Sequence, residues 1–304
     1  MIDNNSKEFI YRHIGPTEAE QETMLKEVGY NSLEDLMKNT VPEKILLKEE
    51  LKIGEPLSEN DALKKLKKIS KQNKIFRNFI GMGYYNSFTP NVILRNILEN
   101  PGWYTSYTPY QPEVAQGRLE MLLNFQQLII DLTGMDIANA SLLDEATAAA
   151  EAVGLSQRLD KNDSKKIFVS SSCNPQTIDL IKTRTEPFGL ELIIGNEKSD
   201  LQNISENIIC GVLSYPGTLG DIQDPSESIS QIHKKNGKAI LVCDLLALTR
   251  LKTPAELGAD IAVGSAQRFG IPMGYGGPHA AFFATKEEFK RSMPGRIIGV
   301  SVDR

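Results

Sequence analysis

Ala239-Ile240-Leu241-Val242-Cys243, closed by Asp244, is the clearest strand in this chain of 304 residues. A continuous apolar run of this length is typical of a parallel strand that is buried on both faces. Comparable runs recur from about residue 140 onwards, at 167–170, 191–194, 208–214, 260–263 and 280–283. Stretches with helical signals separate them, at 144–157, 175–188 and 225–236. This alternation predicts an α/β domain in which helices cover both faces of a mostly parallel sheet.

The first part of the chain is polar and carries helix signals instead. Thr17 and Glu20 form a capping-box pattern, and Gly29 marks the end of that helix. Further helices are expected at 33–38 and 59–72, the last with a lysine-rich face and with Leu63, Leu66 and Ile69 turned inward. We therefore expect three parts. They are a helical N-terminal segment (1–78), aromatic and glycine-rich loops with one long helix (79–140), and the α/β domain (141–304).

Composition excludes several classes of protein. There are 34 Lys and Arg against 39 Asp and Glu, and the net charge of -5 argues against nucleic-acid or membrane binding. No apolar run approaches the roughly 20 residues of a membrane span. The start of the chain resembles neither a signal nor a transit peptide, which favours a cytoplasmic location of the bacterial type. Three cysteines and three histidines lack ligand spacing, so we expect neither a metal site nor disulfides, and we expect Cys210 and Cys243 to be buried.

Chemistry is expected where the strands end, since ligands of open α/β sheets bind at the carboxyl ends of strands. Asp244 ends one strand and could hold the pyridinium nitrogen of pyridoxal phosphate (PLP), or it could simply cap the following turn. The strand at 260–263 leads into Gly264-Ser265-Ala266-Gln267-Arg268-Phe269-Gly270. This loop has the setting of a cofactor-lysine loop, but no lysine occurs between Lys252 and Lys286.

Several long motifs carry a resemblance that covers essentially the whole chain. They include Tyr11-Arg12-His13-Ile14-Gly15-Pro16, Gly81-Met82-Gly83-Tyr84-Tyr85-Asn86, Glu99-Asn100-Pro101-Gly102-Trp103-Tyr104, Tyr107-Thr108-Pro109-Tyr110-Gln111-Pro112-Glu113, Leu142-Leu143-Asp144-Glu145-Ala146-Thr147 and Gly276-Gly277-Pro278-His279. With these motifs the chain resembles the N-terminal part of the glycine cleavage system P-protein family.

The resemblance implies a fold and a reaction. The fold is that of PLP-dependent transferases of fold type I. The reaction decarboxylates glycine through PLP and transfers the aminomethyl group to the lipoyl arm of H-protein. The family is built from two related halves, and the cofactor lysine belongs to the C-terminal half or subunit. In this chain the lysine position falls on Gln267. We therefore expect PLP to be bound by the lysine-bearing half, and Asp244 remains only a weak candidate for cofactor binding.

The same resemblance suggests what this half contributes. Tyr107, Tyr110, Gln111 and Glu113 would reach the partner's active site across an interface, where hydroxyl and amide groups orient glycine or the lipoyl arm; the alternative is that their loop is purely structural. Residues 294–301 resemble an interior segment of the family, so we expect a truncated or split gene product that is inactive alone.

Two other functions remain open. One is a non-catalytic scaffold of degenerate PLP fold that serves dimerisation or regulation. The other is a free-standing aminotransferase-like enzyme, which would need a Schiff-base lysine that the expected loop does not contain.

Overall fold

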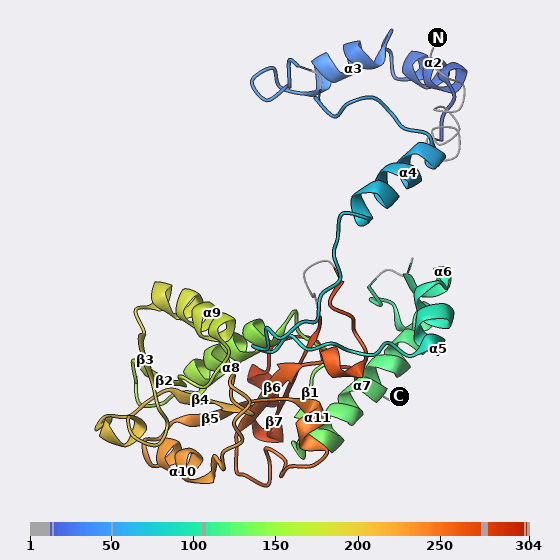
Figure 1. Ribbon diagram of the computed structural model, residues 1–304. Coiled ribbons are helices and arrows are strands. Elements are labelled where there is room, and N and C mark those ends of the chain that lie inside the picture. The colour runs from blue at the N-terminus through green and yellow to red at the C-terminus, as the bar shows by residue number, and fades with distance from the viewer. Residues whose placement is uncertain are drawn as a thin grey trace. The chain divides into compact units, whose positions relative to one another are not determined.

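The structure is a computed structural model that describes residues 13, 15–49, 51–104, 108–274, 279–300 and 302. The chain divides into two compact units, Met1–Arg77 and Asn78–Arg304 (Figure 1). The three-part division expected from the sequence stays a prediction. Among the described residues, no helix combines the length and the hydrophobicity that a membrane crossing requires.

The N-terminal unit contains three helices, α2 (Glu18–Glu27), α3 (Leu33–Thr40) and α4 (Glu59–Ser70). Each begins after a side chain that caps its free amides. Thr17 and Glu20 form the predicted capping box, and Ser32 and Ser58 accept hydrogen bonds from the amides three residues later. The helix predictions for this segment are confirmed in position, with ends that differ by one or two residues.

One expectation for this unit is wrong. Leu63, Leu66 and Ile69 of α4 are between half and two-thirds exposed, although we expected them to face inward. The reason is the small size of this unit. Leu25 is the only buried side chain among its described residues, so the unit itself has no apolar layer for that stripe to pack on.

The second unit is organised around a seven-stranded sheet of order β1-β7-β6-β5-β4-β2-β3. The strands are β1 (Ile137–Ala138), β2 (Lys166–Ser170), β3 (Glu191–Gly195), β4 (Cys210–Tyr215), β5 (Lys238–Cys243), β6 (Ile261–Ser265) and β7 (Ala281–Thr285). Neighbours from β3 to β6 pair in parallel, whereas β7 is antiparallel to both β6 and β1. The predicted mostly parallel sheet is confirmed. The two-residue β1 is too short to give a pattern, and the sequence did not predict it.

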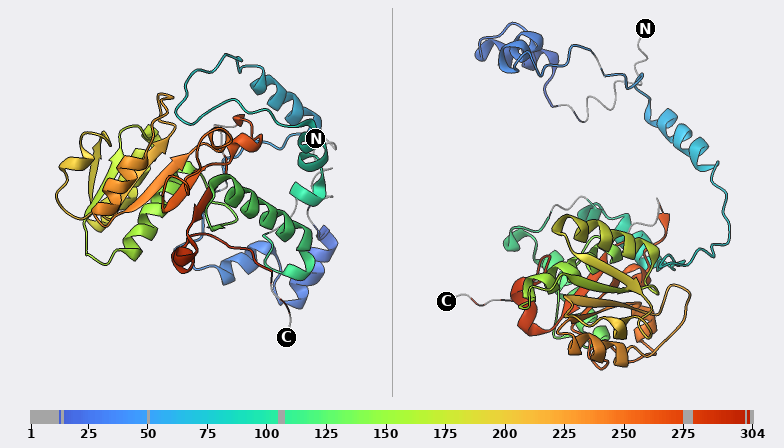
Figure 2. Two further views of the ribbon diagram at one scale, coloured as in Figure 1. Left: turned by 90° about the horizontal axis from the view of Figure 1, so that it is seen from below. Right: turned by 90° about the vertical axis from the view of Figure 1, so that its left-hand side faces the viewer.

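Helices cover both faces of this sheet, as expected. The right-hand view of Figure 2 shows α9 (Pro175–Thr185) and α10 (Ser226–Lys234) on opposite sides of the strands. With α9 lies α8 (Glu145–Leu159), and the other face carries α7 (Gln116–Thr133) and the short α11 (Leu245–Leu248). Alternate residues of β5 point to the two layers. Leu241 and Cys243 pack toward α10 and α11, while Ile240 and Val242 pack toward α8.

A connecting segment before α7 carries little regular structure. It contains α5 (Asn91–Ile93), a π-helical turn at Leu94–Leu98 and α6 (Pro101–Tyr104). Residues 91–98 therefore form one continuous helical stretch, whose second half is wound more loosely. Short 3-10 helices occur at Pro112–Val114, Glu186–Phe188, Leu201–Asn203, Gln267–Phe269 and Glu287–Ser292. The three cysteines are free and buried, which confirms the expectation for Cys210 and Cys243.

Strands β5 and β6 approach each other closely at Gly264. A Cβ atom built on Gly264 would lie 2.1 Å from the carbonyl oxygen of Cys243 and 2.7 Å from the ring of Phe282. No side chain fits in that space without displacing backbone. Glycine at this position therefore allows β6 to continue past β5 to Ser265, and the loops that follow both strands emerge next to each other.

Asp260 ties the opposite end of the sheet together. Its side chain is 5% exposed and accepts hydrogen bonds from the Ala239 amide at 2.8 Å, from His233 Nε2 at 2.8 Å and from Lys286 Nζ at 2.5 Å. Burial by itself raises the pKa of this carboxyl. The hydrogen bonds from Lys286, Ala239 and His233 outweigh burial and hold its pKa below the ordinary 3.8.

We expect Asp260→Asn to lower the unfolding free energy at neutral pH by about 2 kcal/mol, because it removes the charge that pairs with Lys286. Since the folded-state pKa is depressed, the stabilisation is present above pH 3.8 and is lost as the pH falls through the folded value. Urea titrations at several pH values would measure both effects. The exposed Asp179→Asn is the matched control. Equal midpoints for Asp260→Asn and Asp179→Asn at neutral pH would contradict this role.

Candidate functional site

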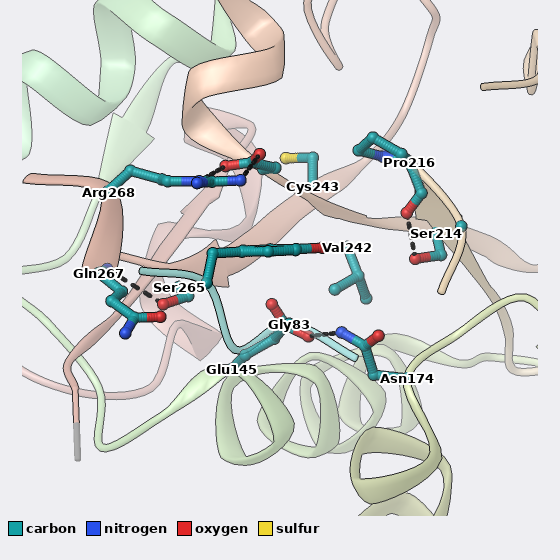
Figure 3. Close-up of a pocket in the computed structure, with 13 residues that line it drawn as sticks. Gly83, Glu145, Asn174, Ser214, Pro216, Val242, Cys243, Ser265, Gln267 and Arg268 are labelled. Atoms are coloured by element: carbon teal, nitrogen blue, oxygen red, sulfur yellow. Dashed lines mark hydrogen bonds and ion pairs between the residues drawn. The ribbon is translucent and has the colours of Figure 1, made fainter. Parts of the chain in front are cut away.

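The carboxyl ends of three parallel strands enclose a small polar pocket. Ser214 of β4, Asp244 after β5 and Ser265 of β6 line it. Figure 3 shows Gln267 and Arg268 entering from the loop after β6, and Glu145 and Asn174 entering from the starts of α8 and α9. This is the edge of an open α/β sheet at which ligands bind.

Asp244 is held by Arg268 within this pocket. Both carboxylate oxygens accept from the guanidinium, at 3.0 Å from Nε and 2.9 Å from Nη2, in a bidentate pair. The guanidinium carbon also lies 4.2 Å from the centre of the Tyr85 ring. Asp244 caps α11 as well, because Oδ1 accepts from the Leu246 amide at 3.2 Å. The capping role considered for Asp244 in the sequence analysis is therefore confirmed, whereas its pairing with Arg268 was not predicted.

Glu145 is the first residue of α8 and is half-buried in the pocket wall. Its Oε1 accepts from Asn174 Nδ2 at 2.8 Å and from Thr177 Oγ1 at 3.4 Å. Burial raises the pKa of this carboxyl, and the hydrogen bond from Asn174 offsets only part of the effect. The adjacent Asp144 accepts from the Thr147 amide at 2.7 Å, so an internal carboxylate already caps the start of the helix.

Gln267 follows β6 at the position on which the family resemblance places the cofactor lysine of the other half. Its side chain is 2% exposed, and its backbone amide donates to Ser265 Oγ at 3.0 Å. Among the described residues, the side-chain nitrogen has no hydrogen-bond partner. An amide cannot act as the amine of a Schiff base. The nearest lysines in sequence, Lys252 and Lys286, do not line this pocket, and Lys286 is paired with Asp260.

PLP does not fit this pocket as the side chains are arranged. The free volume is about 30 Å³, which is room for about one water molecule. Sites for small molecules of cofactor size have on the order of 300 Å³ or more. The aspartate that would face a pyridinium nitrogen is already paired, and the loop carries no amine. The geometry therefore assigns no cofactor chemistry to this pocket.

A tight turn at residues 81–84 forms another wall. Met82 and Gly83 both have positive φ, 54° and 84°, and the Tyr84 amide donates to the Gly81 carbonyl at 3.0 Å. A Cβ on Gly83 would lie 2.7 Å from Asn174 Nδ2. Gln176 Nε2 donates to the Met82 carbonyl at 2.6 Å. This turn is thus fitted against the start of α9 and places Tyr85 under Arg268.

The other predicted site residues lie apart from this pocket. Tyr107 lies outside the described residues. Tyr110 and Gln111 line an open groove of about 730 Å³, while Glu113 lies in the 3-10 turn Pro112–Val114 that follows them and does not line the groove. None of these described residues reaches the pocket at the strand ends.

A stacked cation and ring form the floor of this groove. The Arg118 guanidinium lies 5.0 Å from the Trp103 ring centre and donates to the Trp103 carbonyl at 2.9 Å. Arg296 Nη2 donates to the Pro109 carbonyl at 2.7 Å. The groove therefore combines a cation, an aromatic surface and the exposed Tyr110 hydroxyl.

Sequence reasoning missed Arg268 and Tyr85 as pocket residues and treated Glu145 only as part of a helix start. One signal was available for Arg268. It is a cation beside Gln267 in a loop expected to face the strand-end Asp244. Among the described residues, no group of three or more His, Cys, Asp or Glu is arranged to hold a metal ion.

Comparison with known proteins assigns the chain to a family. The model of the "Glycine cleavage system P-protein" family matches residues 11–304. The chain belongs to this family. It is 75% identical over all of its 304 residues to glycine dehydrogenase (decarboxylating) of Pelagibacter ubique, and it covers 32% of that relative. The enzyme of the same name from Psychromonas ingrahamii is 57% identical over 99% of the chain, which covers 31% of that relative.

Solved structures agree on the fold. The crystal structure of glycine decarboxylase (P-protein) of the glycine cleavage system, in inhibitor-bound form, matches with a TM-score of 0.86 and 36% identity. The match covers 95% of this chain and 66% of that one. A sphingosine-1-phosphate lyase of Burkholderia pseudomallei shares the fold alone, with a TM-score of 0.61 and 12% identity. The PLP-dependent fold expected from the sequence is therefore confirmed. The chain spans about a third of the length of the curated relatives it matches.

We expect Glu145→Gln to stabilise the fold increasingly as the pH rises above 4.5. The folded-state pKa of Glu145 lies above that ordinary value, so wild type loses stability between 4.5 and its folded pKa. A glutamine keeps the acceptor for Asn174 and avoids burying a charge, a gain of about 1 kcal/mol or more. Urea unfolding as a function of pH would measure it. Glu151→Gln on the same helix is the control, and parallel curves for wild type and Glu145→Gln would contradict the expectation.

Proposed function

We propose that this chain is the N-terminal part of a glycine decarboxylase of the glycine cleavage system. The complete enzyme decarboxylates glycine with PLP and passes the aminomethyl group to the lipoyl arm of H-protein. The 75% identity to a glycine dehydrogenase over the whole chain is the observation that carries this proposal. We place the protein in the cytoplasm.

The chemistry requires a lysine-bearing C-terminal half or subunit in this proposal. PLP supplies the electron sink for decarboxylation wherever it is bound. The pocket of this chain supports binding elsewhere, because it has neither an amine at Gln267 nor space beside Arg268. The chain by itself is then inactive, and its contribution is made across an interface with the lysine-bearing half.

The segment with Tyr110, Gln111 and Glu113 is the part we propose to reach the reaction, together with Tyr107. Tyr110 is 69% exposed and borders a groove that contains Arg118. Glycine and the lipoyl arm both carry groups that such a surface can orient. A carboxylate pairs with a guanidinium, and an aliphatic arm packs on an aromatic ring. These contacts support a positioning role for the segment.

Tyr110→Phe in the assembled enzyme should lower kcat/KM for glycine decarboxylation about tenfold, because it removes one hydroxyl that positions substrate. Rates of decarboxylation and of carbon dioxide exchange would be measured with H-protein present. Tyr104→Phe is the control, since Tyr104 is also exposed, lies nearby on α6 and does not line the groove. The same Phe substitution at Tyr107 tests the neighbouring position. Unchanged rates at Tyr107 and Tyr110 would remove both residues from the site.

Treatment of the chain alone with PLP and borohydride should give no stoichiometric adduct at a single site, and mass spectrometry would measure this. A single fully labelled lysine would contradict the proposal. Activity that appears when a lysine-bearing half is added supports the enzyme. A properly associated complex without activity would instead favour the non-catalytic scaffold.

A further inference from the structure

The stack of Asp244, Arg268 and Tyr85 has the components of a cofactor contact. In an enzyme that binds PLP, an aspartate would hold the ring nitrogen and a lysine would form the Schiff base with the aldehyde carbon. In this pocket a planar cation already lies on the aspartate, with both oxygens engaged at 3.0 Å and 2.9 Å. The Tyr85 ring stacks on that cation.

Side chains of this chain also occupy the other places in the pocket where polar groups of a cofactor could bind. The start of α8, where a helix dipole favours an anion, is capped by Asp144, and the half-buried Glu145 carboxyl lies beside it. Gln267 stands at the lysine position with its side chain buried. About 30 Å³ is left between these groups.

The segment that carries Tyr85 is attached to the loop that carries Arg268. Ser87 Oγ donates to the Gln267 carbonyl at 3.2 Å, and Thr89 Oγ1 donates to the Gly270 carbonyl at 2.6 Å. The stack of Arg268 on Tyr85 adds a charged contact between the two segments. The strained turn at 81–84 precedes it directly, with positive φ at the non-glycine Met82.

We propose that Arg268 is an internal substitute for the cofactor ring. Paired with Asp244 and stacked on Tyr85, its guanidinium keeps PLP out of this half and holds residues 81–86 in place. This inference deepens the proposed function, because it names the residue that leaves the cofactor to the lysine-bearing half. Arg268 is thus a positioning residue, since it acts on the turn and does not touch substrate.

The holding role is tested by amide hydrogen exchange on the full chain. Arg268→Met keeps an unbranched side chain and removes the pair with Asp244, so amides of residues 81–86 should exchange about tenfold faster or more, while strands β4–β6 stay protected. Arg184→Met is the control, because Arg184 pairs with Glu151 on the surface between α8 and α9. Unchanged exchange at 81–86 in a folded Arg268→Met variant would overturn the proposal.

A second variant covers the case in which Arg268→Met fails to fold. Tyr85→Leu leaves the Arg268–Asp244 pair intact and removes only the ring that stacks on it. Exchange of the turn amides should again rise while the sheet stays protected. If they exchange as in wild type, the stack does not hold the turn.

The excluding role is tested by restoring the amine. The Gln267→Lys chain is mixed with PLP, reduced with borohydride and mapped by peptide mass spectrometry at position 267. We expect little labelling in this single variant, and about tenfold more in Gln267→Lys/Arg268→Met, where the ring position is free. Full labelling of the single variant would overturn the proposal, as would a folded double variant that labels no better. Hydrogen exchange and PLP labelling do not measure turnover. Failure of this proposal is therefore distinguishable from failure of the proposed function.

Discussion

The architecture depends on the close approach of β5 and β6 at Gly264. With a Cβ only 2.1 Å from the Cys243 carbonyl oxygen, any side chain there would force the two strands apart. The missing side chain allows β6 to reach Ser265 in register, and the loop after it turns back over the end of β5. Asp244 and Arg268 meet because of this one contact, although 24 positions separate them. The chemistry of the pocket follows from a steric requirement in the sheet.

The two described polar regions of the second unit have different characters. The pocket at the strand ends is small, and Asp244 and Arg268 are paired with each other within it. The groove beside Trp103 and Arg118 is open, and Tyr110 and Gln111, which line it, are exposed. A small site whose ion pair is matched internally suits a structural role, whereas an open surface with an exposed tyrosine suits contact with another molecule. This contrast supports a half that presents a surface to a catalytic partner.

The sheet was predictable because its signals are local. Apolar runs such as 239–243 are recognisable without knowing their neighbours, and the caps at Thr17 and Ser32 need only three residues of context. The pocket was less predictable. Arg268 matters through Asp244 and Tyr85, and that contact is created by the order of the strands and by the turn at 81–84. Leu63, Leu66 and Ile69 show that a local signal can also mislead. The amphipathic pattern predicts the helix but does not reveal what the helix packs against.

The Asp244–Arg268 pair also constrains how this sequence can change over time. Each partner is largely buried, and each neutralises the other. Loss of either one alone leaves an uncompensated charge against the Tyr85 ring and the strand ends, at a cost that a marginally stable domain tolerates poorly. A viable lineage would therefore replace the two residues together or keep both. The positions should covary across the family, as a pair separated in sequence and coupled by charge.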